Sequence, residues 1–280
     1  MSGIGEHVKL STEEFVKEAI EIVSRAESRS VKLRILGACA IYIHSMHEQR
    51  AINIYRSLGR FTSSGALFTD LDLMAYSKQR KDVIKFFEEE LKFKYDPLIK
   101  ALFSGKRLIY FHPQNLYHVD VFFDVLEFNH DVYFGKEPGK GRLELDNPTI
   151  SLADLVLEKL QITKINLKDL VDLAVLFRAH DICGQDIHKE CIDGNHIATI
   201  LSDDWGFWYD ATSNLGKLTK FLEEKQREGL LDNSDVEDVK WKTGKLMELI
   251  DRTPKTKNWI KRSKIGTSKP WYREVEEVVR

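Results

Sequence analysis

The chain has 280 residues, and its formal net charge of −2 at pH 7 indicates no overall attraction to a polyanion, although it leaves room for a local basic patch. Its composition of 42% hydrophobic and 31% charged residues is ordinary for a globular protein with a core. No apolar run has the length of a membrane span, and residues 1–10 lack the apolar core of a signal peptide. The length favours two domains, or one domain with an extension.

The chain contains three cysteines, Cys39, Cys183 and Cys191. This number is odd and too small for a disulfide framework, so a reducing cytosol is the simplest interpretation. We therefore expect a cytoplasmic protein that does not associate with a membrane.

The first elements expected are a helix, a short strand and a second helix. Ser11 and Glu14 form a capping-box pattern, after which apolar residues recur at helical spacing. Residues 32–37 alternate and end at Gly37, which predicts a strand and a turn, and residues 38–46 predict a helix. A strand, a glycine and a helix N-terminus can hold an anion, because free backbone N–H groups point there. Tight packing of the strand against the helix explains the glycine equally well.

The stretch from Leu67 to Ala75 alternates as a strand does, so Asp70 and Asp72 share one face while Leu71 and Leu73 share the other. Two neighbouring carboxylates repel each other unless a cation lies between them. Hard oxygen ligands at this spacing suit Mg²⁺ or Mn²⁺. The alternative is a strand whose polar face is simply solvated.

A polar, glycine-flanked segment over residues 59–66 precedes this strand and predicts a loop. Within it, Arg60 either contacts phosphate or is solvated. Residues 78–92 predict a charged helix.

Two further strands, over residues 107–111 and 116–123, flank a Pro-Gln-Asn turn and predict a hairpin. Asp120 lies between apolar neighbours in the second strand, and we select it as a third carboxylate. Asp124 lies at the strand end and is better explained as a cap or a surface residue.

From residue 151 onward the pattern is almost wholly helical. Ser151 begins one helix with a capping pattern, and Asn166 can cap the next, over residues 167–178. We therefore expect an α+β chain, with a mixed-sheet domain over residues 1–150 and a helical domain over residues 151–280.

Four pieces of the sequence follow one another in the order found in a known family. They are Gly37-Ala38-x-Ala40 after a strand, Thr69-Asp70-x-Asp72, Val119-Asp120-Val121, and Asp154-x4-Lys159 followed by Lys168-Asp169-x2-Asp172. With these motifs, over about residues 30–180, the chain resembles the nucleotidyltransferase fold and, more narrowly, the AbiEii/AbiGii toxin-like (MenT-like) family. The resemblance implies a polymerase beta-like mixed sheet flanked by helices, followed by a largely helical region that completes the site.

The match has two departures. The second Gly or Ser of the family's turn is Ala38 here, so a hydroxyl contact to phosphate is lost and a backbone N–H contact remains. The family often has an arginine just before Asp-x-Asp, whereas Phe68 and Thr69 stand there in this chain and Arg60 is the nearest arginine.

The resemblance implies an enzyme that binds an NTP together with Mg²⁺ or Mn²⁺. Asp70 and Asp72 would be metal ligands, and Asp120 would be a third ligand or the base that deprotonates the attacking hydroxyl. Lys159 would contact the triphosphate, and Asp172 would orient Lys159 or the base. The nucleotide-binding positions implied by the match are Gly37, Ala38, Arg60, Thr69 and Lys159. The alternatives are a solvated Lys159 near Glu158, and a surface pair of Asp172 with Lys168.

The implied reaction is transfer of a nucleotide to a hydroxyl of an RNA (tRNA-like) or protein acceptor. The family analogy adds a toxin–antitoxin pair with a cognate antitoxin. One alternative is a small-molecule nucleotidyltransferase of the antibiotic-modifying type. The other is a non-catalytic member of the fold that binds nucleotide or RNA.

Several other residues have chemistry-bearing side chains. His180, Cys183, His188 and Cys191 have zinc-like ligand types and spacing, and the alternative is a loop with partly buried cysteines. Trp205 and Trp208 could stack on a base, but packing between helices is the stronger expectation. We expect no chemistry from His44 and His47.

The segment from Asp251 to Arg273 is basic, with eight Lys or Arg residues against a single acidic one. Trp259, Trp271 and Tyr272 are interleaved with these charges. Basic charge attracts phosphates, and exposed aromatic rings stack on unpaired bases, so the segment is a candidate nucleic-acid contact. The alternative is a solvated helix pair with its tryptophans in the core.

Overall fold

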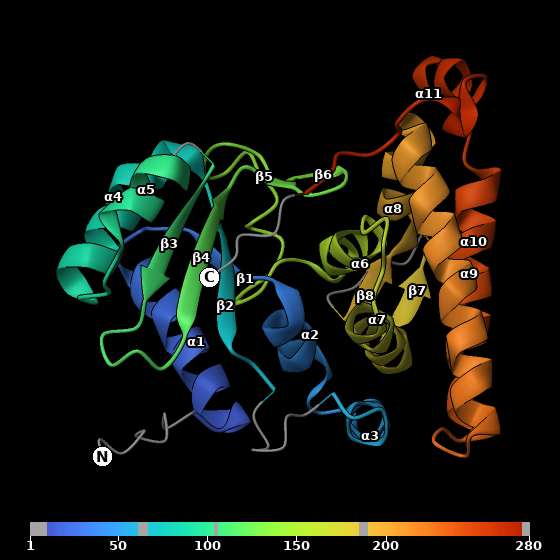
Figure 1. Cartoon of the computed structure of the whole chain (residues 1–280), viewed down its shortest axis with the longest axis horizontal. Helices are drawn as coiled ribbons and strands as arrows, with labels where there is room; N and C mark the ends of the chain where they lie inside the picture. Colours follow the sequence, from blue (N-terminus) through green and yellow to red (C-terminus); the bar gives the residue numbers. More distant parts are fainter. Residues whose placement is uncertain (1–9, 61–66, 104–105, 185–189, 276–280) are drawn as a thin grey trace, which may run out of the picture. The chain divides into compact units, whose positions relative to one another are not determined.

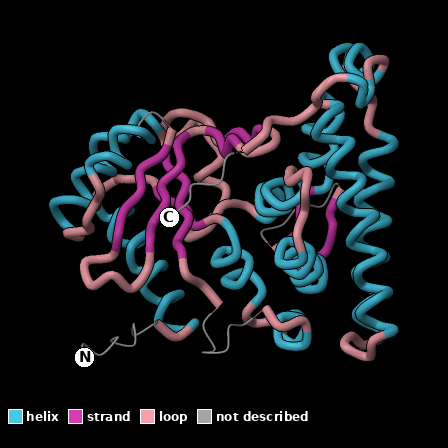
Figure 2. Tube along the Cα trace, viewed as in Figure 1, coloured by secondary structure: helices cyan, strands magenta, loops and turns pink. Residues whose placement is uncertain are grey.

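The computed structural model describes residues 10–60, 67–103, 106–184 and 190–275. It is α+β, with a mixed four-stranded sheet and a helical C-terminal region, which confirms the expected fold class. Figure 2 shows the strands of the main sheet side by side. Helix predominates after residue 150. None of the helices in the described ranges combines the length and apolar character needed to cross a membrane.

The chain divides into two compact units. The first comprises Met1–Ile43, Phe61–Val125 and Tyr133–Ile150, and the second comprises His44–Arg60, Leu126–Val132 and Ser151–Arg280. Two short segments that precede residue 150 therefore belong to the same unit as the C-terminal helices.

The first unit is built on the four-stranded sheet (Figure 1). Its elements are α1 (Thr12–Ser28), β1 (Leu33–Ile35), most of α2 (Gly37–Ser45), β2 (Asp70–Ala75), η1 (Ser77–Gln79), α4 (Arg80–Lys85), η2 (Phe86–Glu90), α5 (Pro97–Phe103), β3 (Arg107–Phe111) and β4 (His118–Phe123). The strand order is β1-β2-β4-β3, in which β2 and β4 are parallel and the outer strands pair antiparallel to them. The pair formed by β5 (Val125–Glu127) and β6 (Asp131–Tyr133) belongs mainly to the second unit.

Helix α1 begins where the sequence predicts it. The Ser11 side chain accepts a hydrogen bond from the Glu14 backbone, and the Glu14 side chain accepts one from the Ser11 backbone, which confirms the capping box. The helix buries its apolar face, including Phe15, whose ring lies 5.1 Å from that of Tyr117. This contact ties α1 to the residue that leads into β4.

The single helix predicted over residues 78–92 is divided. A 3₁₀ turn (η1) comes first, α4 follows, and the last turn (η2) is a π-helix. Phe86 and Phe87 are consecutive, and both are buried. A π turn is a local departure from α-helical spacing that the apolar pattern alone does not predict.

The second unit is mainly helical. Its elements are α3 (Gln49–Ser57), α6 (Leu152–Leu160), α7 (Leu167–Ala179), β7 (Asp181–Cys183), β8 (Cys191–Asp193), α8 (Gly194–Asp203), α9 (Trp205–Arg227), α10 (Asn233–Arg252), α11 (Lys257–Ser263) and η3 (Gly266–Ser268). All nine residues of α6 are buried, so this helix forms the centre of the unit. Asn166 caps α7 by accepting a hydrogen bond from the Asp169 backbone, as predicted.

The expectation of a loop between α7 and α8 is wrong where β7 and β8 form a parallel pair. Each strand has only three residues, so neither shows a clear alternation in the sequence. Their pairing is a contact between separate segments, which local patterns do not predict.

The structure also contains a disulfide between Cys183 and Cys191, whose Cα atoms are 6.0 Å apart. Cys39 is the free cysteine and is buried. An odd cysteine count does not exclude one bridge, and the pairing of β7 with β8 supplies a proximity that the count cannot show. This single bridge is not a disulfide framework, but it differs from what the reducing-cytosol interpretation of the cysteine count would predict.

Candidate functional site

Asp72 on β2 and Asp120 on β4 are directly opposite each other in the parallel register. Opposed residues on neighbouring parallel strands project from the same face of a sheet, so the two side chains are neighbours. Asp120 is buried and Asp72 is half-buried. Arg107 Nη1 lies 3.9 Å from Asp120 Oδ2, at the outer limit of an ion pair. Two like charges in this position favour a cation between them.

The turn between β1 and α2 adjoins the same strand. The backbone N–H of Leu36 donates a 3.0 Å hydrogen bond to the carbonyl oxygen of Asp72. Gly37 follows with a φ of +70°, a conformation that favours glycine, and α2 begins there. Burial raises the pKa of the Cys39 thiol, and the charge of nearby Asp72 raises it further. Gly37 and Ala38, the predicted phosphate contacts, therefore lie beside Asp72.

Asp70 is closer to the surface, with 40% of its side chain exposed. Its Oδ1 lies 3.4 Å from Nδ1 of His118, its partner in the strand register. Thr69 Oγ1 donates to Asp70 Oδ2 at 3.0 Å. The three predicted carboxylates thus share one face of the sheet, and Asp70 lies at the start of β2.

The carboxylate oxygens of Asp70, Asp72 and Asp120 do not all lie within 4.8 Å of one another. Within the described ranges, the one group of three or more potential ligands whose ligand atoms all lie within 4.8 Å is His44, His180 and Glu190. A hard divalent ion on the sheet would therefore use one or two carboxylates and fill its remaining positions with water and phosphate oxygens, as Mg²⁺ commonly does.

In the second unit, Lys159 on α6 is enclosed by negative charge. Its Nζ lies 3.1 Å from Asp169 Oδ1 and 3.0 Å from Asp172 Oδ2, both on α7. Burial alone would lower the pKa of Lys159, but the charges of Asp172 and Asp169 outweigh it and raise the pKa, so the amine is protonated. Lys159 is buried, so the alternative of a solvated lysine is wrong.

Asp172 contacts two further residues of the same unit. Its Oδ1 accepts hydrogen bonds from the Tyr55 hydroxyl and from Arg60 Nε, each at 3.3 Å. The side chain of Asp172 is fully buried while Lys168 is exposed, so the alternative of a surface pair between them is wrong. Arg60, predicted as a phosphate contact, is thus grouped with Lys159 and Asp172 within the second unit.

The sequence reasoning gave no separate role to Asp169 or Tyr55. The sequence could have indicated Asp169, because residues three apart on a helix lie on the same side. A lysine that pairs with Asp172 is therefore expected to lie close to Asp169 as well. Tyr55 had no such signal, since it is 117 residues from Asp172 in the chain.

The zinc-type pattern does not form one ligand set. Cys183 and Cys191 are joined, and His188 lies outside the described residues. In the β7–β8 register Asp181 is opposite Cys191, and Cys183 is opposite Asp193, so both cysteines project from one face. His180 has extended backbone and directly precedes Asp181, which puts its side chain on the other face.

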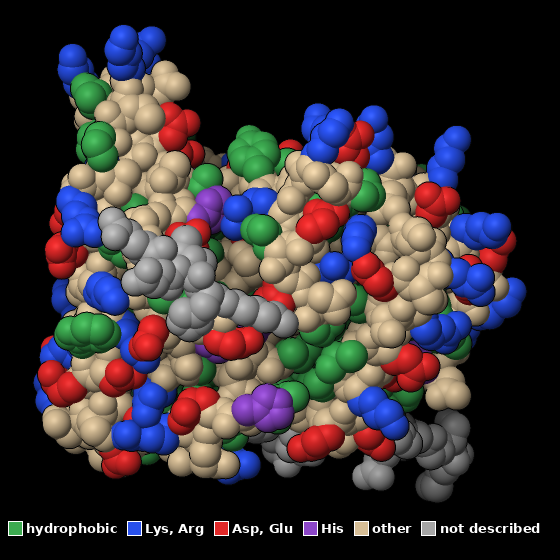
Figure 3. Space-filling view, turned by 180° about the vertical axis from the view of Figure 1, so that it is seen from behind, with side chains coloured by type: hydrophobic (Ala, Val, Ile, Leu, Met, Phe, Trp, Pro, Cys, Tyr) green, Lys and Arg blue, Asp and Glu red, His purple; other side chains and the backbone are tan. Residues whose placement is uncertain are grey.

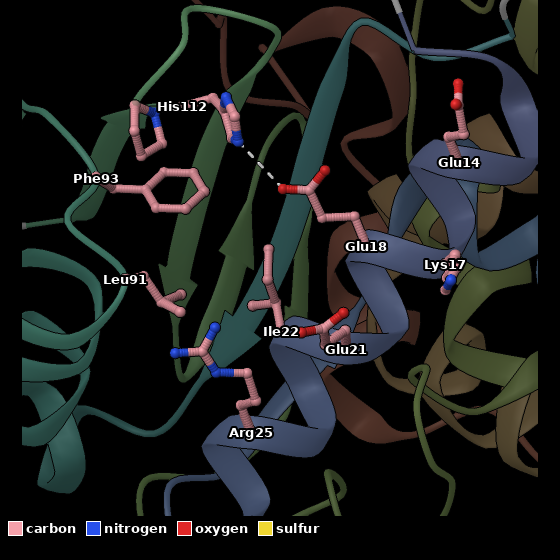
Figure 4. Close-up of a pocket in the computed structure, with 10 residues that line it drawn as sticks. Glu14, Lys17, Glu18, Glu21, Ile22, Arg25, Leu91, Phe93 and His112 are labelled. Atoms are coloured by element: carbon pink, nitrogen blue, oxygen red, sulfur yellow. Dashed lines mark ion pairs between the residues drawn. The ribbon is translucent and has the colours of Figure 1, made fainter.

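A hollow of about 350 Å³ lies on the first unit between α1 and the end of β3 (Figure 4). It is lined by charged residues of α1 and by Leu91, Phe93, His112 and Pro113. Glu18 points toward His112, and their side chains form a 3.2 Å ion pair, while the Tyr117 hydroxyl donates to Glu18. No predicted site residue lines this hollow, and its central carboxylate is already paired.

The aromatic residues of the basic segment have partners within the second unit. The rings of Trp208 and Trp259 are 5.1 Å apart, and Trp271 Nε1 donates to Asp210 Oδ1 at 3.1 Å. Trp205 is buried, so the packing interpretation of these tryptophans is confirmed for Trp205, Trp208 and Trp259.

The charges of the basic segment are of two kinds. Arg262 donates to three backbone carbonyl oxygens of the following turn, and Arg273 pairs with Asp131 at 2.9 Å. Lysine side chains remain exposed on and after α11, where blue side chains gather (Figure 3, top left). They are Lys257, Lys261, Lys264 and Lys269.

Comparisons of the chain with protein-family models, with curated proteins and with solved structures gave no significant match.

Proposed function

We propose that the chain is a metal-dependent nucleotidyltransferase that transfers a nucleotide from an NTP to a hydroxyl group of an acceptor. The observation that carries this proposal is the direct opposition of Asp72 and Asp120, with the turn at Gly37 hydrogen-bonded through Leu36 to the same strand. These features occur in the order found in the AbiEii/AbiGii toxin-like nucleotidyltransferases that the sequence resembles.

The donor set on the sheet fits Mg²⁺ or Mn²⁺. Asp72 and Asp120 are carboxylates, the ligands such ions prefer, and Asp70 lies on the same face two residues before Asp72. A divalent ion bound there would neutralise phosphate charge during transfer. Nitrogen or sulfur ligands, which favour softer metals, are not needed for this role.

The chain's own groups supply the remaining functions. An NTP carries about four negative charges, and the backbone N–H groups of Gly37 and Ala38 at the start of α2 bind its phosphate oxygens. Asp120, the most buried of the three carboxylates, accepts the proton of the attacking hydroxyl. The new bond joins that oxygen to the α-phosphorus, and pyrophosphate leaves.

Lys159 and Asp172 form the second part of the proposal. Two cations, Lys159 and Arg60, and two anions, Asp169 and Asp172, balance one another inside the second unit. The family resemblance implies a triphosphate contact for Lys159, and the pairing of its protonated amine with Asp169 and Asp172 is what this unit itself contributes to that proposal. Asp172 is a positioning residue, since it contacts both cations and fixes where their charges lie.

For the acceptor, the exposed lysines on and after α11 favour RNA. Lys257, Lys261, Lys264 and Lys269 can contact phosphates without disturbing the packed tryptophans. The resemblance to toxins extends the proposal to growth arrest that a cognate antitoxin relieves. Comparing growth during expression of the wild type and of Asp70→Ala/Asp72→Ala tests that extension.

The transfer proposal is tested by incubating purified protein with Mg²⁺, each α-labelled NTP and total RNA, beside the Asp70→Ala/Asp72→Ala variant. We expect the wild type to transfer the α-label to RNA and the variant to transfer none. Label in the protein itself would indicate a protein acceptor, and label only after addition of small hydroxyl compounds would indicate the small-molecule alternative. Equal labelling by both proteins, or no labelling of any acceptor, would contradict the proposal.

A further inference from the structure

Three residues of the second unit bring metal-binding atoms together away from the sheet carboxylates. His44 lies in the last turn of α2, His180 directly follows α7, and Glu190 directly precedes β8. One ligand atom from each lies within 4.8 Å of the other two. The two imidazole rings are perpendicular, with centroids 5.8 Å apart. This grouping joins residues up to 146 positions apart.

The surroundings of His180 fix which of its nitrogens is available. Its Nδ1 lies 3.2 Å from the carbonyl oxygen of Glu190, and because a carbonyl only accepts, that nitrogen carries the proton. Its Nε2 is then unprotonated, and it is buried without a hydrogen-bond partner among the described residues. A backbone carbonyl that holds Nδ1–H is the usual second-shell support of a histidine that ligates metal through Nε2.

Glu190 supplies the third ligand, a carboxylate. Its Oε2 lies 3.9 Å from His180 Nδ1, the nitrogen that carries the proton, and 60% of the Glu190 side chain is exposed, so the carboxylate has room to turn toward an ion bound to Nε2. Lys242, whose charge acts on His180, is itself paired with Asp181 at 3.3 Å and Asp238 at 3.0 Å. Its charge is therefore already compensated.

We propose that His44, His180 and Glu190 form a binding site for one divalent transition-metal ion of the Zn²⁺ class. Two imidazoles and one carboxylate are a ligand set that such ions use, and it leaves a position for water. Mg²⁺ and Ca²⁺ prefer all-oxygen ligands, so the site discriminates against the ion required by the sheet carboxylates. The disulfide-bonded cysteines project from the opposite face of β7 and β8 and take no part.

Such an ion would connect three segments that are separate in the sequence. It would hold the end of α2 to the start of the β7–β8 pair, all within the second unit. The site is independent of nucleotidyl transfer, so either proposal can fail without the other.

The test uses the full chain without an affinity tag, stripped of metal by chelator and kept oxidised so that the disulfide stays closed. Zn²⁺ is titrated by calorimetry, and Co²⁺ is titrated by visible absorption. The expected result is one Zn²⁺ per chain, and visible Co²⁺ bands without the near-ultraviolet thiolate absorption that cysteine ligands produce.

The variants His44→Gln and Glu190→Gln remove ligands at half-buried and exposed positions, so they avoid the buried His180. Each is expected to weaken Zn²⁺ binding by about tenfold or more. His47→Gln is the matched control, because His47 is exposed three residues from His44 and should leave binding unchanged. Circular dichroism of each variant checks that it is folded.

The Cys183→Ser/Cys191→Ser variant is expected to bind Zn²⁺ as the wild type does. Loss of binding in that variant, unchanged binding in His44→Gln or in Glu190→Gln, or no Zn²⁺ uptake by the wild type would each overturn the proposed site.

Discussion

Asp72 and Asp120 are directly opposite each other on the parallel strands β2 and β4, and the backbone of Asp72 also accepts the hydrogen bond that anchors the turn before α2. Two neighbouring carboxylates repel each other and destabilise the folded state unless a cation binds between them. The pair therefore links the packing of the sheet to the proposed chemistry.

Mg²⁺ is expected to raise the melting temperature of the wild type, because a ligand that binds the folded state stabilises it. Asp72→Asn removes one of the two like charges, so it is expected to melt at the same or a higher temperature without metal and to lose most of the Mg²⁺-induced increase. Differential scanning fluorimetry over a Mg²⁺ series measures both effects. Asp82→Asn, at an exposed position on α4, is the control and should respond as the wild type does.

Lys159→Met is expected to destabilise the fold by about 3–5 kcal/mol, because it leaves Asp169 and Asp172 buried without their shared cation. Urea unfolding gives the free energy. Lys168→Met is the matched control, since it removes a lysine from the exposed side of α7 and should change stability by about 0.5 kcal/mol or less. Equal effects of the two substitutions would show that the buried charge group is not as described.

Asp210 makes stability sensitive to acid. Burial alone would raise the pKa of Asp210, but hydrogen bonds from His130, Thr163 and Trp271 outweigh it and lower the pKa. A carboxyl with a lowered pKa in the folded state stabilises the protein above its unfolded-state pKa, and this contribution is lost as the pH falls through the lowered value.

The free energy of unfolding of the wild type should therefore fall more steeply from about pH 5 downward than that of Asp210→Asn. At neutral pH the variant is expected to be less stable by about 1–3 kcal/mol, because the partners of Asp210 lose a charged acceptor. Parallel pH–stability curves that differ only by a constant offset would contradict this assignment.

Reduction of the Cys183–Cys191 disulfide should destabilise the chain by about 2.5 kcal/mol, the chain-entropy value for a bridge across eight residues. Thermal melts with and without reductant measure the loss, and Cys183→Ser/Cys191→Ser should reproduce it without reductant. If reductant lowers the melting temperature of the double variant by the same amount, the effect does not come from this bridge.

Local sequence patterns correctly predicted those features that depend only on residues close together in the chain. The caps at Ser11 and Asn166 are such signals, and so is the alternation that puts Asp70 and Asp72 on one face of β2. Each rests on periodicity or on a hydrogen bond between residues a few positions apart, so the sequence contains it in full.

The features that sequence reasoning missed depend on contacts between distant segments. The pairing of β7 with β8, which puts Cys183 near Cys191, is one example. The approach of His44 to His180 is another, and so is the burial of Lys159 against α7. A lysine in a helix has the same local sequence whether its partner is water or a buried aspartate, so only the packing distinguishes them.

The most direct test of nucleotidyl transfer is a comparison of Asp72→Asn, Asp120→Asn, Asp82→Asn and the wild type in a single assay with Mg²⁺ and α-labelled and γ-labelled NTP. The wild type and Asp82→Asn are expected to transfer the α-label but not the γ-label. Asp72→Asn and Asp120→Asn are expected to lose about 100-fold or more of this activity. Transfer of α-label at the wild-type rate by either of those two variants would show that the opposed carboxylates do not carry nucleotidyl transfer.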